Sequence, residues 1–388
     1  MKWPSRRIAD SSEKSFGMFG KAARLAAEGH DIIHLEVGRP SFDTPRHIKE
    51  ATKKALDDGI VHYGEFAGTE KLRAALAEKV KTYNGIDASP DEILVTNGLS
   101  HAAYAALTAG VDDGDEVIML EPFYPQHINK IEMAGGRIVN APLDAAGNYR
   151  LRADWIEERV TPRTRMIVLV NPANPVGRVF TRDELDGLAD IAIRHDLLVI
   201  SDEVYDQIVY DDHRHISIAT LPGMWERTIT MFAFTKVYAM DGWRLGYAVC
   251  DRRFMPALLK VTMNDVTHVN VFAQEGAYVA ITGPQDCLEE MHGVDARRRE
   301  LVCQRLNQMP GVTCPWPEGT IYAFADVSAL GVPSARLAED ILDTTGVAVE
   351  AGSFYGPAGE GHLRICFGAE PYERLEMAMD RLSTFFNR

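Results

Sequence analysis

Six short apolar runs along the middle of the chain constrain the fold more than any other feature of the sequence. They cover residues 92–98, 115–122, 164–172, 196–203, 228–236 and 244–251. Each is almost continuously hydrophobic, which is typical of strands buried on both faces of a sheet. A helix is predicted between two of them at 181–195, opened by a capping box of Thr181 and Glu184. Alternating strands and helices of this kind predict an α/β fold with a mostly parallel central sheet covered by helices.

The pattern changes after about residue 275. A charged helical stretch at 285–308 precedes strands predicted at 321–327, 347–352 and 362–367 and helices predicted at 334–345 and 371–386. This is the pattern of a smaller α+β unit. We therefore predict two domains in the 388 residues: a large one at 45–275, and a small one built from 1–44, with an N-terminal arm, and 276–388. At their junction, Thr44 and Pro45 are expected as the N-cap and first-turn residue of a helix.

Charge and composition exclude several classes of protein. The formal net charge is −15, from 41 basic and 56 acidic residues, which argues against a nucleic-acid partner. No apolar stretch follows the basic start of the chain, so we expect neither a signal peptide nor a membrane anchor and place the chain in the cytoplasm. The five cysteines have no CxxC spacing, which fits a reducing compartment. His213 and His215 lack a third ligand in their polar loop, so we expect a solvated turn and no metal site.

The candidate chemistry lies in the residues that follow the predicted strands, because ligands of open parallel sheets bind beyond the carboxyl ends of the strands. Each residue has an ordinary structural explanation when taken alone: a loop and cap, a turn, an exposed lysine, or an aromatic core residue. Together they form a much more specific series, which runs in chain order through a helix start that suits a phosphate, an aromatic ring, an amide, a carboxylate and an amine: Leu99 with Ser100, Tyr124, Asn174, Asp202 and Lys236.

The order of these motifs resembles that of the class I/II aminotransferases, which are pyridoxal-phosphate-dependent enzymes of fold type I. The resemblance extends from about residue 15 to residue 385. The strongest segment is FAFTKVYAMDGWRLGY at 232–247, supported by NPANPVG at 171–177 and SDEVYDQIVY at 201–210. The resemblance implies an enzyme that moves an amino group between an L-amino acid and a 2-oxo acid. It also implies pyridoxal 5'-phosphate as the cofactor and a homodimer with shared active sites.

The resemblance also implies a role for each matching residue. Lys236 would bind the cofactor aldehyde covalently and then move the substrate α-proton as a base. Asp202 would pair with the pyridine nitrogen, so that the ring accepts carbanion electrons. Tyr205 and Asn174 would hydrogen-bond the phenolic oxygen, and the ring of Tyr124 would lie against the pyridine face.

Two anionic groups need further partners in this scheme. The resemblance assigns the cofactor phosphate to Leu99, Ser100 and Arg244, with Tyr63 reaching across the dimer interface from the neighbouring subunit. It assigns the α-carboxylate of the substrate to a bidentate clamp by Arg364, in a pocket that Gly38 and Asn174 also line.

The sequence departs from the family pattern at a few positions. Ala233 replaces a serine that usually helps to hold the phosphate, Val176 replaces a threonine, and Asp241 replaces a threonine before Gly-Trp-Arg. Arg39 occupies a position that is commonly acidic, where a structural salt bridge and recognition of an acidic substrate side chain both remain open. His268 is expected at the subunit interface, with a place in the substrate pocket as the alternative.

Other functions on the same scaffold remain open at this point. A β-lyase resembling cystathionine β-lyase, or a synthase of the aminocyclopropane-carboxylate type, would share the same cofactor residues. A transcription regulator would need a DNA-binding head of ~60–70 residues before the first motif, and Gly38 already belongs to the enzyme pattern. An inactive binding module is disfavoured because Lys236, Asp202 and Arg244 occur together.

Overall fold

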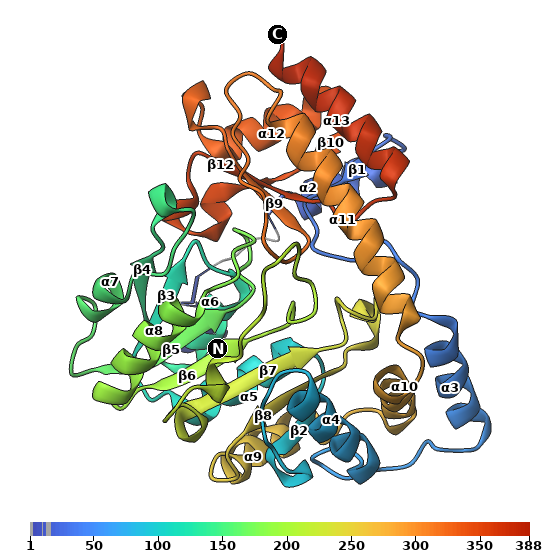
Figure 1. Cartoon of the computed structure of the whole chain (residues 1–388), viewed down its shortest axis with the longest axis vertical. Coiled ribbons are helices and arrows are strands. Elements are labelled where there is room, and N and C mark those ends of the chain that lie inside the picture. Colours follow the sequence, from blue (N-terminus) through green and yellow to red (C-terminus); the bar gives the residue numbers. More distant parts are fainter. Residues whose placement is uncertain (1–2, 10, 13–16) are drawn as a thin grey trace.

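The computed structural model describes residues 3–9, 11–12 and 17–388, in which a large sheet with its helices carries a smaller sheet on one edge (Figure 1). The large sheet has the strand order β2-β8-β7-β6-β5-β3-β4. Strand β8 runs opposite to the other six strands, which are parallel to one another, so the predicted mostly parallel sheet is confirmed. The bounds of these strands are β2 Ile93–Thr96, β3 Glu116–Glu121, β4 Arg137–Pro142, β5 Thr164–Val170, β6 Leu198–Asp202, β7 Thr228–Ala233 and β8 Gly246–Cys250.

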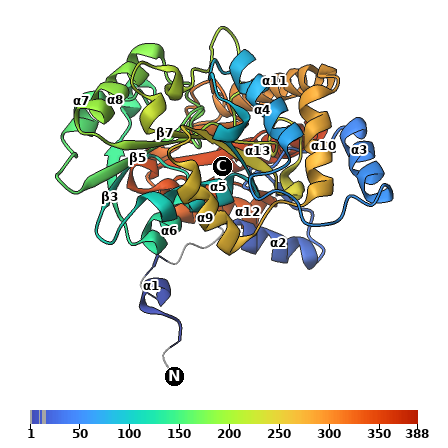
Figure 2. The same cartoon turned by 90° about the horizontal axis from the view of Figure 1, so that it is seen from below.

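Helices cover both faces of this sheet because its strands bury side chains on both sides. On β5, Met166 and Val168 belong to one hydrophobic core, while Ile167 and Leu169 belong to the other. Figure 2 shows α7 and α8 on one face and α5, α6 and α9 on the other. The helices of this part of the chain are α3 Arg46–Asp57, α4 Glu70–Thr82, α5 Leu99–Gly110, α6 Gln126–Ala134, α7 Ala153–Glu157, α8 Arg182–Arg194, α9 Met255–Asp265 and α10 Val271–Thr282.

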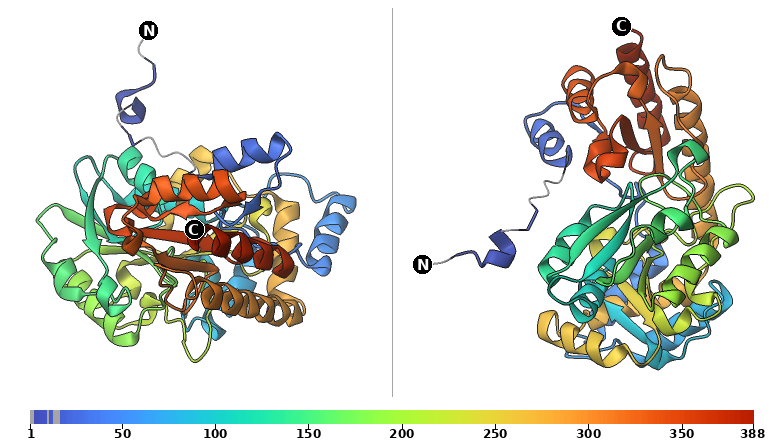
Figure 3. Two further views of the ribbon diagram at one scale, coloured as in Figure 1. Left: turned by 90° about the horizontal axis from the view of Figure 1, so that it is seen from above. Right: turned by 90° about the vertical axis from the view of Figure 1, so that its left-hand side faces the viewer.

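The C-terminal part of the chain builds the second sheet and packs helices against it. Strands β9 Tyr322–Asp326, β11 Glu350–Ala351 and β12 His362–Cys366 form an antiparallel sheet of order β11-β12-β9, and β10 Val347–Ala348 pairs separately with β1 Ile33–His34. Figure 3 shows this sheet and its helices stacked above the large sheet. These helices are α11 Asp286–Leu306, α12 Ser334–Thr345 and α13 Tyr372–Phe386.

The N-terminal arm reaches both parts of the molecule. Helix α1, Arg6–Ala9, projects from the body beside α6 (Figures 2 and 3), and Ser12 donates its backbone N–H to Glu132 of α6 at 2.7 Å. Helix α2, Phe19–Ala27, is tied to α12 by an ion pair between Lys21 and Asp343 at 2.8 Å. Among the described residues, no helix combines the length and apolarity needed to cross a membrane.

Some local predictions are corrected by the structure. Strand β4 was not predicted, because residues 137–142 lie at the edge of the sheet and are only partly buried, so they lack the continuous apolar pattern. Pro45, not Thr44, occupies the N-cap position of α3, and the Thr44 hydroxyl donates to the carbonyl of Ala239 at 2.6 Å instead. The domain boundaries at residues 45 and 275 stay predictions.

Candidate active site

A cavity of about 710 Å³ opens where the carboxyl edge of the large sheet meets the small sheet. Its walls come from strand ends, from the starts of α5 and α6, and from the N-terminal arm. All but one of the predicted site residues line this cavity: Gly38, Leu99, Ser100, Tyr124, Asn174, Asp202, Tyr205, Lys236, Arg244 and Arg364. Segments that are far apart in the sequence therefore converge on one site.

Asp202 ends β6 and places a carboxylate inside the cavity, only 2% exposed. Its Oδ2 lies 3.2 Å from Nε2 of His127, which belongs to α6. Its Oδ1 accepts the backbone N–H of Val204 at 3.3 Å. The ring of Tyr124 stands edge-on to His127, with the ring centroids 5.3 Å apart. His127 thus links the aromatic wall of the cavity to the carboxylate.

Lys236 follows β7 and extends its amine into the same cavity. Its Nζ donates a hydrogen bond to the backbone carbonyl of Gly38 and lies 5.9 Å from the centroid of the Tyr205 ring. Glycine is required at position 38 for steric reasons, because a Cβ there would lie 1.9 Å from the hydroxyl oxygen of Tyr322. The segment that carries Gly38 therefore approaches both the amine and the small sheet.

The start of α5 forms a cradle suited to an anion. Gly98 is its N-cap with a φ of +79°, and a Cβ there would lie 2.4 Å from Nη2 of Arg244. Only glycine allows both this backbone conformation and the approach of the guanidinium. The first-turn N–H groups of Leu99 and Ser100 and the charge of Arg244 thus face one region, an arrangement that binds phosphate or carboxylate.

Arg364 lies on β12 and brings a buried guanidinium, 6% exposed, into the cavity from the small sheet. Its Nη1 donates to Oδ1 of Asn174 at 3.2 Å, and its Nη2 donates to the carbonyl of Glu36. The guanidinium lies over the rings of Tyr322 and Tyr355, at 4.3 and 4.9 Å from their centroids. Its Nε is buried and has no hydrogen-bond partner in the described part of the chain. A buried guanidinium that lines a cavity and has no carboxylate in ion-pair distance among the described residues suits an anionic ligand.

A second contact crosses between the two sheets beside Arg364. The hydroxyls of Tyr205 and Tyr322 are hydrogen-bonded, 2.7 Å apart, and both rings are buried. Burial raises the pKa of the Tyr205 hydroxyl well above its usual value, and the neighbouring Tyr322 raises it further. Tyr205 is therefore protonated at neutral pH.

Tyr63 is the predicted site residue that lies outside the cavity of this single chain. Its side chain is 91% exposed, and its ring meets the edge of His268 with centroids 5.6 Å apart. His268 and Arg39 do not line the cavity either, among the residues that the structure describes.

Several cavity residues were missed by sequence reasoning. His127 follows Tyr124 by three residues, a helical spacing that could have indicated a shared face. Tyr322, Tyr355 and Glu350 come from the small sheet and its loops, and no local pattern in the sequence marks them. Burial raises the pKa of Glu350 to about 7, against the opposing effect of Arg364, and its Oε2 accepts the backbone N–H of Met18 at 3.1 Å.

Lys130, a turn further along α6, also lines the cavity and was not predicted. Its amine turns back toward the start of the helix, donating to the carbonyl of Gln126 at 2.7 Å. Burial lowers the pKa of Lys130 to about 8, and the charge of Asp202 opposes that shift.

Of the two histidines that were expected in a solvated turn, His213 agrees with that prediction, with 41% of its side chain exposed, and His215 does not. The side chain of His215 is only 5% exposed, and its Nε2 lies 3.3 Å from Oε2 of Glu203 behind the cavity. His213 lies 3.8 Å from Glu318. Residues 211–214 are exposed as the sequence predicts, and only from His215 onward does the loop pack against the end of β6.

Comparisons with known proteins agree with this geometry. The family model described as aminotransferase class I and II matches residues 30–382. An aspartate aminotransferase of Pyrococcus abyssi is 42% identical over 92% of this chain and 92% of its own length. The aromatic-amino-acid aminotransferase 2 of Thermococcus litoralis is 41% identical over the same share of both chains.

Solved structures extend the similarity to three dimensions. The aromatic aminotransferase from Pyrococcus horikoshii superposes with a TM-score of 0.90 at 41% identity, covering 94% of this chain and 98% of its own. The aspartate aminotransferase from Thermus thermophilus with maleate has a TM-score of 0.94 at 32% identity, covering 99% and 100%. The chain therefore belongs to the class I and II aminotransferases, pyridoxal-phosphate-dependent enzymes of fold type I that transfer amino groups.

Proposed function

We propose that this aminotransferase exchanges an amino group between an L-amino acid and a 2-oxo acid inside the cavity, with Lys236 as the proton-transferring base and Arg364 as the carboxylate clamp. The observation that supports this assignment most is the convergence of the Lys236 amine, the Asp202 carboxylate and the Arg364 guanidinium on one cavity. Together they would supply a base for the substrate α-proton, a carboxylate for the cofactor ring nitrogen and a cation for the substrate α-carboxylate.

The residues present fit pyridoxal phosphate. The glycine-dependent cradle of Gly98, α5 and Arg244 suits its phosphate, and the buried carboxylate of Asp202 suits a protonated ring nitrogen. Tyr205 and Asn174 would hydrogen-bond its phenolic oxygen, and Tyr124 would lie against its ring. When bound, the cofactor supplies a ring that accepts the negative charge left at the substrate α-carbon.

The chain's own groups bind and orient the amino acid. The Arg364 guanidinium would hold the α-carboxylate through two parallel hydrogen bonds, which fixes the α-carbon relative to Lys236. The Lys236 Nζ would then take the α-proton. Tyr322 and Tyr355 pack against the guanidinium and screen it from water, which strengthens its attraction for the carboxylate.

The active form is proposed to be a cytoplasmic homodimer. Tyr63 is exposed together with apolar neighbours that include Val61 and Phe66, a surface that suits a protein contact. From this surface, Tyr63 would reach the cofactor phosphate of the partner subunit. We also propose that residues 45–275 form the large domain, and that 1–44 and 276–388 form the small one.

A half-reaction tests the function directly. The purified protein, loaded with pyridoxal phosphate, is mixed with single amino acids, including aspartate and phenylalanine, since the relatives are named for aspartate and for aromatic amino acids. The visible band of the lysine-linked cofactor should disappear while one equivalent of 2-oxo acid forms, and Lys236→Ala should abolish both changes. Release of ammonia with pyruvate in the absence of an amino acceptor would instead establish elimination and overturn the proposal.

A further inference from the structure

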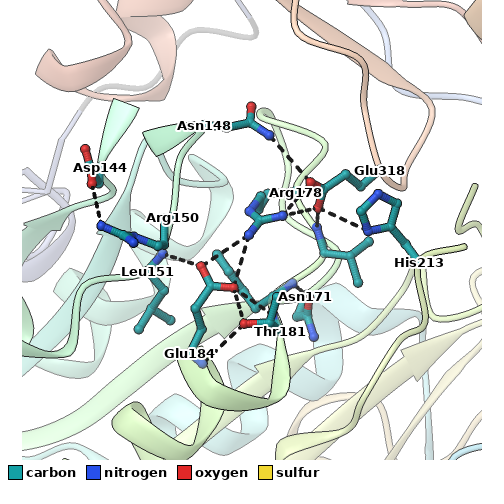
Figure 4. Close-up of polar contacts among 12 residues, drawn as sticks. Asp144, Asn148, Arg150, Leu151, Asn171, Arg178, Thr181, Glu184, His213 and Glu318 are labelled. Carbon is teal, nitrogen blue, oxygen red and sulfur yellow. Dashed lines mark hydrogen bonds and ion pairs between the residues drawn. The ribbon is translucent and has the colours of Figure 1, made fainter. Parts of the chain in front are cut away.

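A cluster of ion pairs joins the two parts of the molecule close to the cavity without lining it (Figure 4). At its centre, Nη1 of Arg178 donates to both carboxylate oxygens of Glu318, at 2.5 Å to Oε2, and Nη2 lies 3.2 Å from Oε2 of Glu184. The side chains of Arg178 and Glu318 are only 13% and 10% exposed. This is a largely desolvated, multiply bonded pair, unlike the surface pairs that contribute little.

Backbone hydrogen bonds attach the same two residues to neighbouring loops. Oε2 of Glu318 accepts the N–H of Val179 at 3.0 Å, and the N–H of Glu318 donates to the carbonyl of Gly177 at 2.8 Å. The carbonyl of Glu318 in turn accepts the N–H of Tyr210 at 2.8 Å. Glu318 is thus held between the loop that follows β5 and the segment that follows β6.

The loops that carry Arg178 and Glu318 each also carry a side chain that contacts Arg364. Asn174, four residues before Arg178, accepts a hydrogen bond from the Arg364 guanidinium. Tyr322, four residues after Glu318, lies under that guanidinium and bonds Tyr205. The loop with Asn174 is itself tight, because the N–H of Ala173 donates to the carbonyl of Arg178 at 2.8 Å.

From these contacts we propose that the Arg178–Glu318 ion pair has a positioning role: it fixes the two loops relative to one another and so holds Asn174 and Tyr322 in place against Arg364. The inference rests on the proposed role of Arg364 as the carboxylate clamp. Arg178 and Glu318 touch neither the cavity nor the reacting atoms, so they act only through these two loops. A shift of about 1 Å between the loops would misplace the guanidinium, and misplacement of that size costs up to about 100-fold in an enzyme reaction.

Substitutions that keep the shape of the junction test this role. Glu318→Gln keeps the acceptor for Val179 but removes the charge, and Arg178→Lys keeps the charge but loses the planar fork. We expect Glu318→Gln to raise KM for amino acids and 2-oxo acids about tenfold with a smaller change in kcat, and Arg178→Lys to lie between it and the parent enzyme. An unfolded fraction would lower the apparent kcat but leave KM unchanged. A rise in KM therefore distinguishes a positioning role from a loss of stability.

The chain offers a control away from the cavity in the pair of Arg163 and Glu116, in which the carboxylate is buried and the cation is 63% exposed. Glu116 is as buried as Glu318, Nη2 of Arg163 lies 2.7 Å from its Oε1, and the pair sits at the opposite, amino end of β3. Arg163→Met should therefore lower stability without changing KM. A direct readout is the calorimetric Kd of a carboxylate without an amino group, such as 3-phenylpropionate, which should rise in Glu318→Gln and stay constant in Arg163→Met.

The outcomes separate this inference from the proposed function. If Arg364→Lys raises KM but Glu318→Gln behaves like Arg163→Met, the positioning role is refuted and the clamp stands. If Arg364→Lys itself leaves KM unchanged, the clamp is wrong and the inference falls with it. A rise in KM for Arg364→Lys and Glu318→Gln, with none for Arg163→Met, supports both.

Discussion

The cavity and the Arg178 cluster both bury charged groups where the two sheets meet, yet they satisfy those charges in different ways. In the cluster, Arg178 meets two carboxylates, those of Glu184 and Glu318. In the cavity, Arg364 has no carboxylate within 4.0 Å among the residues that the structure describes, and its donors go to an amide oxygen and a carbonyl.

The difference separates a structural ion pair from a ligand site. Burying a charge without an opposite partner is costly, and the protein accepts that cost at Arg364, where a substrate carboxylate would supply the missing partner. At Arg178 the partners are internal, so the same side chain adds stability and order. Loss of the cation should therefore have opposite effects on stability in the two regions.

The largest effect is expected at Lys236. Lys236→Ala should lower the transamination rate by about 10⁴-fold, because both the covalent link to the cofactor and the proton-transferring group are lost. The melting temperature of the cofactor-free protein should not fall, since the amine donates to the carbonyl of Gly38 and forms no ion pair with the residues that the structure describes. Steady-state kinetics measure the loss of rate, and thermal unfolding measures the melting temperature. A rate within tenfold of the parent would assign the proton transfer to another residue.

The next effect concerns the folded state. Arg178→Leu should lower the free energy of unfolding by about 3–5 kcal/mol, because Glu184 and Glu318 would both be left buried without their cation. Urea unfolding of the cofactor-free protein measures this change. The control is a substitution of Lys54 on the surface of α3, which pairs with the exposed Asp58. It should change the free energy of unfolding by no more than about 0.5 kcal/mol.

Arg364→Leu should weaken substrate binding without lowering the stability of the fold. We expect it to cost about 2 kcal/mol or more of substrate binding energy while leaving the unfolding free energy of the cofactor-free protein equal or higher. The physical reason is that a buried charge without a direct ion pair among the described residues is replaced by an apolar side chain. Substrate titrations and urea unfolding measure the two quantities. Strong destabilisation by this change would show that Arg364 is as structural as Arg178 and would remove the contrast.

The sequence predicts the two regions unequally. Asp202, Asn174 and Lys236 follow buried parallel strands, and the geometry of such sheets brings strand ends to one edge whatever the loops do. The pairing of Arg178 with Glu318, 140 residues apart, depends on how the small sheet docks, and no spacing records it. Tyr322 was missed for the same reason.

Burial of polar loops was also harder to predict than burial of strands. His215 was expected in solvent because it stands among polar neighbours, yet its side chain is buried, and its Nε2 lies 3.3 Å from Oε2 of Glu203 without a hydrogen-bond partner among the described residues. The chain beside it is held at the end of β6 by Ser217, whose hydroxyl donates to Glu203 at 2.8 Å. Such a partner is not visible in a local pattern.

The smallest expected effect is a change in how stability depends on pH. It concerns the neighbouring residues Asp202, in the cavity, and Glu203, outside it. Asp202 faces the cavity, whereas Glu203 is buried behind it, and burial raises the pKa of Glu203 to about 8. Burial lowers the pKa of its neighbour His215 to about 4. Both groups therefore prefer the neutral form in the folded chain.

These shifts predict how stability depends on pH. Between the unfolded pKa of a glutamate, near 4.5, and about 8, the folded chain keeps a proton on Glu203 that the unfolded chain has lost, so stability falls as pH rises. Between about 4 and 6.5, the unfolded chain protonates His215 and the folded chain does not, so stability rises with pH. The two slopes oppose one another at acidic pH, and only the falling one remains above about 6.5.

Glu203→Gln should therefore remove the loss of stability between about pH 6.5 and 8, while His215→Gln should extend that loss down to about pH 5, each with a slope of at most about 1.4 kcal/mol per pH unit. Urea unfolding of the cofactor-free protein at a series of pH values measures both slopes. Because the two substitutions act in opposite directions on the same buried pair, a general loss of packing cannot imitate the result. Parallel pH profiles for the two variants would show that Glu203 is ionised in the folded chain, and that the region behind β6 holds an ion pair like the one at Arg178.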